Sequence, residues 1–494
     1  MKILFVSPLF PNTFWSFKYA IKFLRKKAAF PPLGLLTIAS MLPHEWEKRV
    51  VDMNTNKLSN KDIIWADYVF IGAMIIQSES VEAVIERCRK YKTKIVAGGP
   101  LFTMNYDSYI DKIDHLILNE AEITLPKFLD DLEHNCTKQI YTSSEFADIK
   151  TTPIPSWNLV DFKKYASMSI QYSRGCPFEC DFCNVTSLFG RKMRQKSSTK
   201  IISELNSIYD AGYRGAIFFV DDNFIGTIAS LKRDLLPALA TWRKNHPGIS
   251  FFTEVSINIA DDEKLMTLMR EAGFDQVFIG IETPSNDGLA ESNKKQNNNR
   301  DLIRDIRKIQ KNGLQVQAGF IVGFDSDTED IFQQQVDFIQ ESGITTAMVG
   351  LLQAPPGTSL YRRMEKMNRL SKTPSGDNAD GSTNIIPVSM DLDTLVNGYK
   401  NILAQIYAPK NYYKRLKIFL EVYKSDSKTD NISMNRIMAF VKSIYRIGII
   451  GRERHHYWKL LLWTCIKHPK SFPVAVNLSI LGFHFRKTVK HYIN

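Results

Sequence analysis

Three cysteines in a stretch of eleven residues carry the strongest chemical signal in this sequence. They stand in Ser173-Arg-Gly-Cys176-Pro-Phe-Glu-Cys180-Asp-Phe-Cys183, with no fourth cysteine within thirty residues before them or fifty after them. Thiolates bind zinc or iron–sulfur clusters, but a structural zinc site uses four protein ligands. Three thiolates therefore favour a [4Fe-4S] cluster with one iron left open to a small molecule. A zinc knuckle completed from a distant segment, or three unpaired structural thiols, are the alternatives on spacing alone.

Carboxylates and an amide form a second group of candidates, because each follows an apolar, strand-like run. Asp221, Asp222 and Asn223 are placed to accept hydrogen bonds from a ligand ammonium group. Ending a strand or capping the next helix is their alternative role. Glu254 and Glu282 close two later runs. A buried glutamate without a partner is costly, so we expect each of these two to meet a ligand, a basic group or water.

A regular series of strands and helices must position these groups. Strand-like segments recur roughly every thirty residues, with helical segments such as Thr199–Ala211 and Asp261–Ala272 between them. Six such units predict a partial (β/α)6 barrel over residues 166–370, with its active-site groups at the carboxyl ends of the strands. The cysteine loop follows the first strand. The six predicted strands are 168–172, 216–220, 251–255, 276–281, 316–322 and 346–352.

The first 145 residues predict a separate α/β domain with a doubly wound parallel sheet. Five strand-like runs, 2–7, 49–53, 68–76, 94–97 and 115–118, are separated by helical segments such as Pro32–Leu42 and Val81–Tyr91. Ligands of such sheets bind outside the carboxyl ends of the strands. The residues expected there are Ser7, Pro8, Gln77, Ser78, Gly98, Gly99, Pro100, Asn119 and Glu120.

Length and composition bound the remaining organisation. A chain of 494 residues is long enough for about three domains. We expect a linker over 146–165, stiffened by Thr152-Pro-Ile-Pro-Ser156, and a helical, basic extension over 371–494 that opens with the polar loop 371–384. The cysteines outside the motif are scattered, which excludes a disulfide framework and fits the reducing cytoplasm. No leader is expected, because the opening run ends at Pro8 without a small-residue cleavage site.

Charge is concentrated in the last part of the chain. The formal net charge is +12, and residues 409–494 hold 11 Lys and 6 Arg against 4 acidic residues. Two apolar runs there, 458–466 and 473–483, are each about half the roughly twenty residues that span a bilayer. They predict either an interfacial helix pair on an anionic membrane surface or a helical cap packed on the barrel. Nucleic acid is not an expected partner, because no RNA-binding module is recognisable.

The cysteine segment resembles the signature of the radical S-adenosylmethionine (SAM) enzymes, including Phe182 before the last cysteine. The resemblance implies that Cys176, Cys180 and Cys183 hold a [4Fe-4S] cluster whose open iron binds SAM. It also implies that the cluster cleaves SAM to a 5′-deoxyadenosyl radical. The run Gly319-Phe-Ile-Val-Gly323 is similar to the family element that lies along the adenine. The SAM-binding residues it implies are Phe182, Asp221, Asp222, Asn223, Glu254, Glu282, Gly319 and Gly323.

The N-terminal domain, placed ahead of such a barrel, resembles the cobalamin-binding domain of the cobalamin-dependent subfamily. Leu188-Phe-Gly-Arg, Val220–Gly226 and Gly319–Asp325 are similar to the group that contains the bacterial hopanoid 2-methylases. The chain departs from the subfamily pattern in one respect: it lacks the Asp-x-His-x-x-Gly element that supplies a histidine to cobalt, and Ser7-Pro-Leu-Phe-Pro-Asn stands in its place. Either cobalamin binds without histidine ligation or the domain is vestigial.

These resemblances predict a cobalamin-dependent methyltransferase acting on an unactivated carbon of an apolar substrate such as a hopanoid or another lipid. A reducing electron donor such as flavodoxin or ferredoxin is then required. Two other functions stay open: a radical SAM enzyme that rearranges, cyclises or couples its substrate without methylation, and a non-catalytic cobalamin or iron sensor. We expect a cytoplasmic protein, with peripheral contact to the inner membrane surface through residues 409–494 as one reading of the basic extension.

Overall fold

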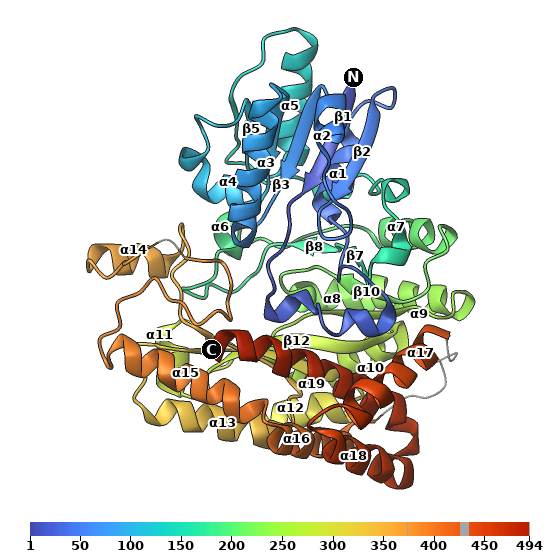
Figure 1. The fold of residues 1–494 in the computed structure, drawn as a ribbon, viewed down its shortest axis with the longest axis vertical. Helices are drawn as coiled ribbons and strands as arrows, with labels where there is room; N and C mark the ends of the chain where they lie inside the picture. The colour runs from blue at the N-terminus through green and yellow to red at the C-terminus, as the bar shows by residue number, and fades with distance from the viewer. Residues whose placement is uncertain (373, 425–433, 494) are drawn as a thin grey trace.

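The computed structural model describes residues 1–372, 374–424 and 434–493. Residue 373 of the predicted polar loop, residues 425–433 of the predicted extension and residue 494 lie outside the described residues. Figure 1 shows three tiers: an N-terminal α/β domain, a barrel-like layer below it, and a group of C-terminal helices beneath and beside the barrel.

The N-terminal domain is a doubly wound parallel sheet, as predicted, with the strand order β2-β1-β3-β4-β5-β6. Alternate residues of β1 belong to two different cores. Ile3 and Phe5 pack with α1 and α5, whereas Leu4 and Val6 pack on the other face with α2, α3 and α4. Burial on both faces explains why its strands are almost continuously apolar. The elements are β1 (Lys2–Ser7), α1 (Leu33–Met41), β2 (Glu47–Asp52), α2 (Asn60–Trp65), β3 (Tyr68–Gly72), α3 (Ser78–Lys90), β4 (Lys94–Gly98), α4 (Pro100–Asn105), β5 (His115–Ile117), α5 (Ala121–Glu133) and β6 (Ile140–Tyr141).

The barrel layer is a second six-stranded parallel sheet with the order β14-β13-β12-β11-β10-β7, and all six predicted strands are present. Its elements are β7 (Met168–Ile170), β8 (Ser173–Arg174), α6 (Val185–Phe189), β9 (Arg194–Gln195), α7 (Ser198–Asp210), β10 (Ala216–Phe219), α8 (Ile228–Ser230), α9 (Leu236–Asn245), β11 (Ser250–Glu254), α10 (Glu263–Ala272), β12 (Phe274–Glu282), α11 (Asn286–Glu291), α12 (Leu302–Lys311), β13 (Gln315–Val322), α13 (Asp330–Ser342) and β14 (Thr346–Leu351).

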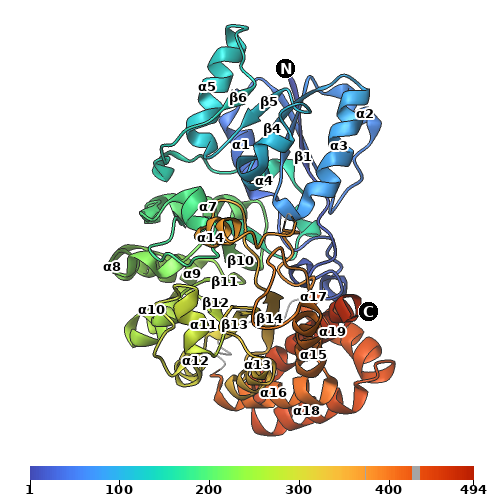
Figure 2. The same ribbon diagram turned by 90° about the vertical axis from the view of Figure 1, so that its left-hand side faces the viewer.

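The C-terminal helices share one continuous core with the barrel and with the segment that follows β1. Phe14 of that segment stacks on Phe485 of α19, with ring centroids 4.4 Å apart. Figure 2 shows α15, α16, α18 and α19 gathered on one side of the molecule. The elements are α14 (Ser359–Lys366), α15 (Leu392–Ile406), α16 (Pro409–Val422), α17 (Met434–Ser443), the π-helix η12 (Ile444–Ile449), α18 (Arg454–Lys467) and α19 (Phe472–Ile493).

One predicted strand boundary was wrong, and one strand was missed. The strand predicted over 68–76 ends at Gly72, because the side chain of Gln77 accepts a 2.9 Å hydrogen bond from the backbone N–H of Met74 and bends the chain into a 3-10 turn. A sixth strand that was not predicted, β6, lies within the predicted N-terminal domain and pairs parallel to β5. Of the two predicted tail runs, the second falls in α19, which is largely buried and therefore caps the barrel.

Candidate active site

The three cysteines lie on one loop between β8 and α6, at the carboxyl end of β7. β8 pairs antiparallel with β9, which closes the base of the loop. Gly175 has φ of 94°, and a Cβ there would lie 3.0 Å from the carbonyl oxygens of Gly190 and Lys192. Glycine is therefore required at the position before Cys176. The backbone N–H of Cys176 also bonds to the Gly190 carbonyl at 3.3 Å.

Neighbouring segments hold the far side of this loop. The backbone N–H of Asp181 bonds to the Ser292 carbonyl, and its carboxylate accepts from Arg363 at 2.6 Å. The amide of Gln296 donates to the Cys180 sulfur at 3.8 Å. The loop is thus fixed by α14 and by the segment after α11, both far away in sequence.

The donor set suits an iron–sulfur cluster. All three thiols are only partly exposed, and each of Cys176 and Cys183 interacts electrostatically with Cys180. Burial raises the pKa of Cys183 to about 12 and also raises that of Cys176, which disfavours free thiolates. Bound iron would supply the positive charge that stabilises them. Among the described residues, no three His, Cys, Asp or Glu side chains are grouped closely enough to hold a metal ion as they stand. The fit therefore rests on the thiols and their shared loop.

The polar residues after β10 are mostly committed to the protein itself. Buried Asp221 accepts from the backbone N–H groups of Tyr172 and Ser173 and from the Ser173 hydroxyl. Asp222 accepts from the Gly175 N–H at 3.2 Å. Burial raises the pKa of Asp221 to about 7 and that of Asp222 to about 6. These two side chains position the start of the cysteine loop.

Asn223 links two strand ends, because its side-chain oxygen accepts from the N–H of Ser256 at 3.2 Å. Glu254, the last residue of β11, has a different environment: no hydrogen-bond partner for its carboxylate is present among the described residues. Burial, and then the carboxylates of Asp222 and Asp221, raise the pKa of Glu254 to about 8. A half-buried carboxylate without a partner is a strong candidate for contact with a cationic ligand.

Glu282 ends β12 with an unusual positive φ of 68° and pairs with Lys294 at 2.7 Å. Burial alone would lower the pKa of Lys294, but Glu282 and the nearby Cys180 and Cys183 outweigh burial and raise it. The ammonium group also lies 6.0 Å from the centroid of the Phe182 ring. The segment after α11 therefore places a cation beside the cysteine loop, which sequence reasoning missed.

The two candidate glycines, Gly319 within β13 and Gly323 directly after it, differ in their surroundings. Gly319 lies inside the strand, where a Cβ would be 3.1 Å from the Phe278 ring. Gly323 follows the strand with φ of 102°, and its N–H bonds to Asp327 at 2.8 Å. Phe182 packs at the edge of a small apolar cluster around Leu352. The structure thus brings Gly319 and Phe278 together in the sheet, whereas Gly323 shapes a turn.

Half-exposed aromatic rings line the barrel face opposite its helices. Phe218 and Phe252 stack with centroids 4.8 Å apart, and Phe30 of the N-terminal segment packs on Phe218 at 5.4 Å. Further along, Trp15 packs edge-on against Phe278 and donates to the Met348 sulfur at 2.9 Å. The chain after β1 thus covers part of an apolar inner surface.

The residues predicted to contact a ligand of the N-terminal domain lie at the carboxyl ends of its strands, and this edge of the sheet faces the barrel in Figure 1. The side chain of Gln77 donates to the Pro8 carbonyl at 2.6 Å, which ties the end of β1 to the start of α3. Ser7 is buried at the end of β1, and Ser78 bonds to the Ile75 carbonyl. Gly98 ends β4 and Gly99 follows it, both close to neighbouring backbone, and Pro100 begins α4.

The carboxylate of Glu120 is engaged elsewhere. It accepts from Arg194 of β9 at 2.7 Å and from the backbone N–H of Ala147. Arg174 of β8 forms a fork to Glu122 with distances of 2.7 and 3.0 Å. The strands on either side of the cysteine loop, β8 and β9, are therefore held against the N-terminal domain by buried ion pairs. These pairs could not be predicted from the sequence.

The same edge exposes apolar side chains, namely Leu9, Phe10 and Met74. Histidine is absent from it. His44 precedes β2 and His115 begins β5, so both lie toward the amino edge, and His134 follows α5 at the surface. Within residues 1–145, which are all described, no histidine stands where a ligand of this edge would need it.

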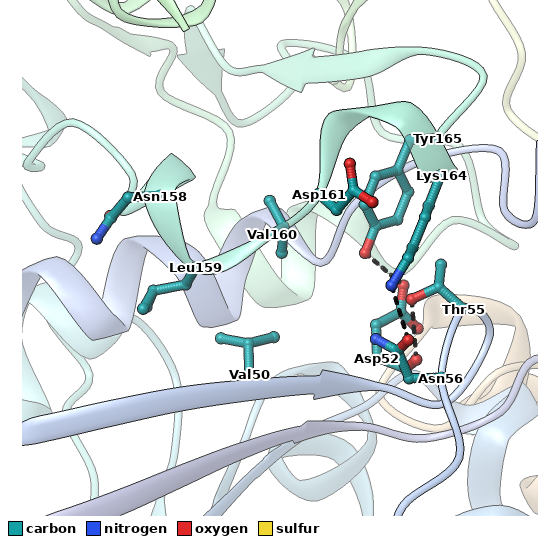
Figure 3. Close-up of a pocket in the computed structure, with 10 residues that line it drawn as sticks. All are labelled: Val50, Asp52, Thr55, Asn56, Asn158, Leu159, Val160, Asp161, Lys164 and Tyr165. Atoms are coloured by element: carbon teal, nitrogen blue, oxygen red, sulfur yellow. Dashed lines mark hydrogen bonds between the residues drawn. The ribbon is translucent and has the colours of Figure 1, made fainter.

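A pocket of about 340 Å³ lies apart from these groups, between β2 and the predicted linker (Figure 3). Tyr165 donates to the buried carboxylate of Asp52 at 3.0 Å, and Lys164 donates to Asn56 at 2.8 Å. No cysteine or other predicted site residue lines it. Its polar groups bond to each other, which accounts for their arrangement without a ligand.

Known proteins resemble this chain in both sequence and fold. Residues 170–339 match the radical SAM superfamily, and residues 358–494 match a domain of unknown function, DUF4070. The hopanoid C-2 methylase of Rhodopseudomonas palustris is 32% identical over 94% of this chain and 90% of its own length. The chain belongs to the radical SAM family that includes this methylase. An uncharacterised methyltransferase of Synechocystis sp. is 37% identical over 98% of the chain and 91% of its own length.

Two solved structures share the fold of this radical SAM enzyme. The cobalamin-dependent radical SAM enzyme OxsB, with aqua-cobalamin and SAM bound, has a TM-score of 0.63 at 16% identity, covering 99% of this chain and 83% of OxsB. The radical SAM methyltransferase TsrM from Kitasatospora setae, with cobalamin and a [4Fe-4S] cluster bound, has a TM-score of 0.62 at 13% identity, covering 93% and 98%. The predicted family, fold class and enzyme class are confirmed, and the predicted cofactors agree with those of these proteins.

Proposed function

We propose that this radical SAM enzyme is a cobalamin-dependent methyltransferase that acts on a carbon of an apolar, lipid-like substrate. The observation that carries the proposal is the match to the hopanoid C-2 methylase across nearly the whole chain. The ring-lined inner surface of Phe218, Phe252 and Phe278 supports an apolar substrate, because it offers carbon rather than hydrogen-bonding atoms to the barrel interior.

Cys176, Cys180 and Cys183 would hold a [4Fe-4S] cluster. When bound, the cluster and SAM supply a carbon-centred radical, and cobalamin supplies a transferable methyl group. Glu254 is the residue best suited to accept the SAM ammonium, since Asp221 and Asn223 already have partners. Lys294 is placed to neutralise charge beside the cysteine loop.

Cobalamin would bind at the carboxyl edge of the N-terminal sheet, between Gln77, Gly98, Gly99 and the apolar side chains Leu9 and Phe10. Exposed apolar residues at an edge that otherwise faces the barrel suit a flat macrocycle. Among the described residues no histidine lies at this edge, so none would be available there to bind cobalt. A small reducing protein such as a flavodoxin or ferredoxin would supply electrons.

The test is anaerobic turnover of the reconstituted enzyme with cobalamin, a reductant, methyl-deuterated SAM and a lipid extract. Deoxyadenosine, adenosylhomocysteine and deuterium in a lipid together are the expected result. Deoxyadenosine without adenosylhomocysteine would overturn methylation and leave a radical enzyme of another kind. The Cys183→Ala variant is the control for background chemistry. In Phe252→Asp, lipid methylation should fall much more than SAM cleavage if the aromatic surface holds the substrate.

A further inference from the structure

Large apolar side chains are exposed along α17, η12 and α18. The helices α17 and α18 lie at the lower right of Figure 1. We call this surface the apolar tail face, and define it by Val441, Tyr445, Ile449, Ile450, Leu462 and Ile466. Exposure reaches 58% at Val441, 61% at Leu462 and 76% at Ile466. Isolated exposed apolar residues are ordinary, but a contiguous group of them marks an interaction surface.

The spacing makes this surface continuous. Val441, Tyr445 and Ile449 recur every four residues, so they form one stripe along α17 and η12. Leu462 and Ile466 continue a second stripe that begins at Trp458. The indole N–H of Trp458 donates to the Gly448 carbonyl at 2.9 Å, which joins the two stripes where the helices meet.

The side chains of the apolar tail face do not take part in packing the helices against the barrel. The opposite sides of the same helices are buried, through Ala439 and Ile447 on α17 and η12, and through Leu460 and Leu461 on α18. The exposed stripes are therefore additional to the residues that attach the helices to the barrel.

The charge around the face has one sign. Residues 434–470 contain eight Lys or Arg and a single acid, Glu453, which is buried and paired with Arg486. Beside the first stripe, burial and then the cationic neighbours Arg25 and Arg446 lower the pKa of Lys442. Such a set of cations around apolar side chains complements a surface of anionic headgroups over hydrocarbon.

We propose that the apolar tail face docks peripherally on an anionic lipid bilayer. Its apolar side chains enter the interface, and the surrounding cations meet lipid phosphates. No described helix is long and apolar enough to cross a membrane, so the contact lies along the surface. The proposal goes beyond methyl transfer and does not depend on it, because vesicle binding is measured without turnover.

The experiment is flotation of the full chain with vesicles of phosphatidylcholine alone or with roughly 40% phosphatidylglycerol. We expect binding to the anionic vesicles only, and release at about 0.5 M salt. Leu462→Ser/Ile466→Ser should weaken binding about tenfold, because two apolar side chains leave the interface. Arg446→Glu/Lys459→Glu should weaken it at least as much.

The matched controls lie on other surfaces. Ile64→Ser/Val388→Ser replaces side chains of 61% and 63% exposure, and Lys61→Glu/Lys264→Glu reverses two exposed charges; both should bind as the unmodified chain does. Equal loss in tail and control variants would overturn the proposal. So would a dimer, seen by light scattering, that the tail variants dissociate, or retention on RNA in place of vesicles. Circular dichroism confirms that each variant is folded.

Discussion

The ammonium of Lys294 lies 2.7 Å from the Glu282 carboxylate, in a pair whose side chains are only 12% and 8% exposed. Glu282 ends the fourth barrel strand, whereas Lys294 comes from the loop after α11. The pair brings a positive charge next to Cys180 and Cys183. It thus connects the geometry of the strand end with the electrostatics of the cysteine loop.

Replacing Lys294 by Met should therefore cost roughly 3–5 kcal/mol of unfolding free energy, because Glu282 is left buried without a partner. Anaerobic denaturant titration measures this cost. The double variant Lys294→Met/Glu282→Gln should recover much of it, since the uncompensated charge is gone. Lys295→Met, at the exposed neighbouring position, is the control and should change stability by less than about 0.5 kcal/mol. Equal effects of the two single substitutions would contradict the role of the pair.

Gly280 leaves the space that this ion pair occupies. A Cβ at Gly280 would lie 2.8 Å from the Lys294 nitrogen and even closer to the Glu282 carboxylate. Gly280→Ala should push the pair apart and destabilise the protein by roughly 1–3 kcal/mol. Ala at Gly34, where nothing lies within 4 Å, is the control and should have little effect. Thermal unfolding followed by circular dichroism compares the two variants.

The fork from Arg174 to Glu122 should be sensitive to the shape of the cation. Lysine cannot form the two parallel bonds of 2.7 and 3.0 Å, so Arg174→Lys should cost roughly 2–3 kcal/mol and lower the iron bound per chain. Arg191→Lys is the matched control, because the Arg191–Glu179 pair is exposed and worth little. Iron content after anaerobic reconstitution distinguishes a loosened cysteine loop from a loss of stability elsewhere; unchanged iron in Arg174→Lys would contradict the anchoring role.

The features predictable from the sequence were local ones. Each barrel strand is an apolar run of a few residues, and the cysteine motif is contained in eleven positions, so both could be recognised without knowledge of the fold. The partners of the site residues were not predictable in the same way. Lys294 stands in a polar run and meets Glu282 only because the chain turns back after α11. Arg194 reaches Glu120 across 74 positions, and Trp15 reaches Met348 across 333. Contacts at such separations depend on how whole domains pack, and no spacing in the sequence encodes them.

The contact that His484 of α19 makes with the segment after β1 should make the free energy of unfolding depend on pH. The imidazole of His484 lies buried in α19, with one ring nitrogen 2.9 Å from the Phe14 carbonyl and the other 3.4 Å from the Tyr19 N–H. Burial lowers the pKa of His484 from 6.5 to about 4. Below pH 6.5 His484 binds a proton in the unfolded chain but stays neutral in the folded chain. The free energy of unfolding therefore falls as the pH drops toward 4.

Between pH 7.5 and pH 5 this single histidine should reduce the unfolding free energy by about 2 kcal/mol. The His484→Gln variant keeps a side chain that can donate to the Phe14 carbonyl but cannot titrate. Its unfolding free energy should therefore fall less over the same pH range, and the difference between the two proteins isolates the histidine from all other titrating groups. Denaturant titrations at the two pH values give that difference. Identical pH dependence in both proteins would contradict the prediction, because it would mean that folding does not lower the pKa of His484.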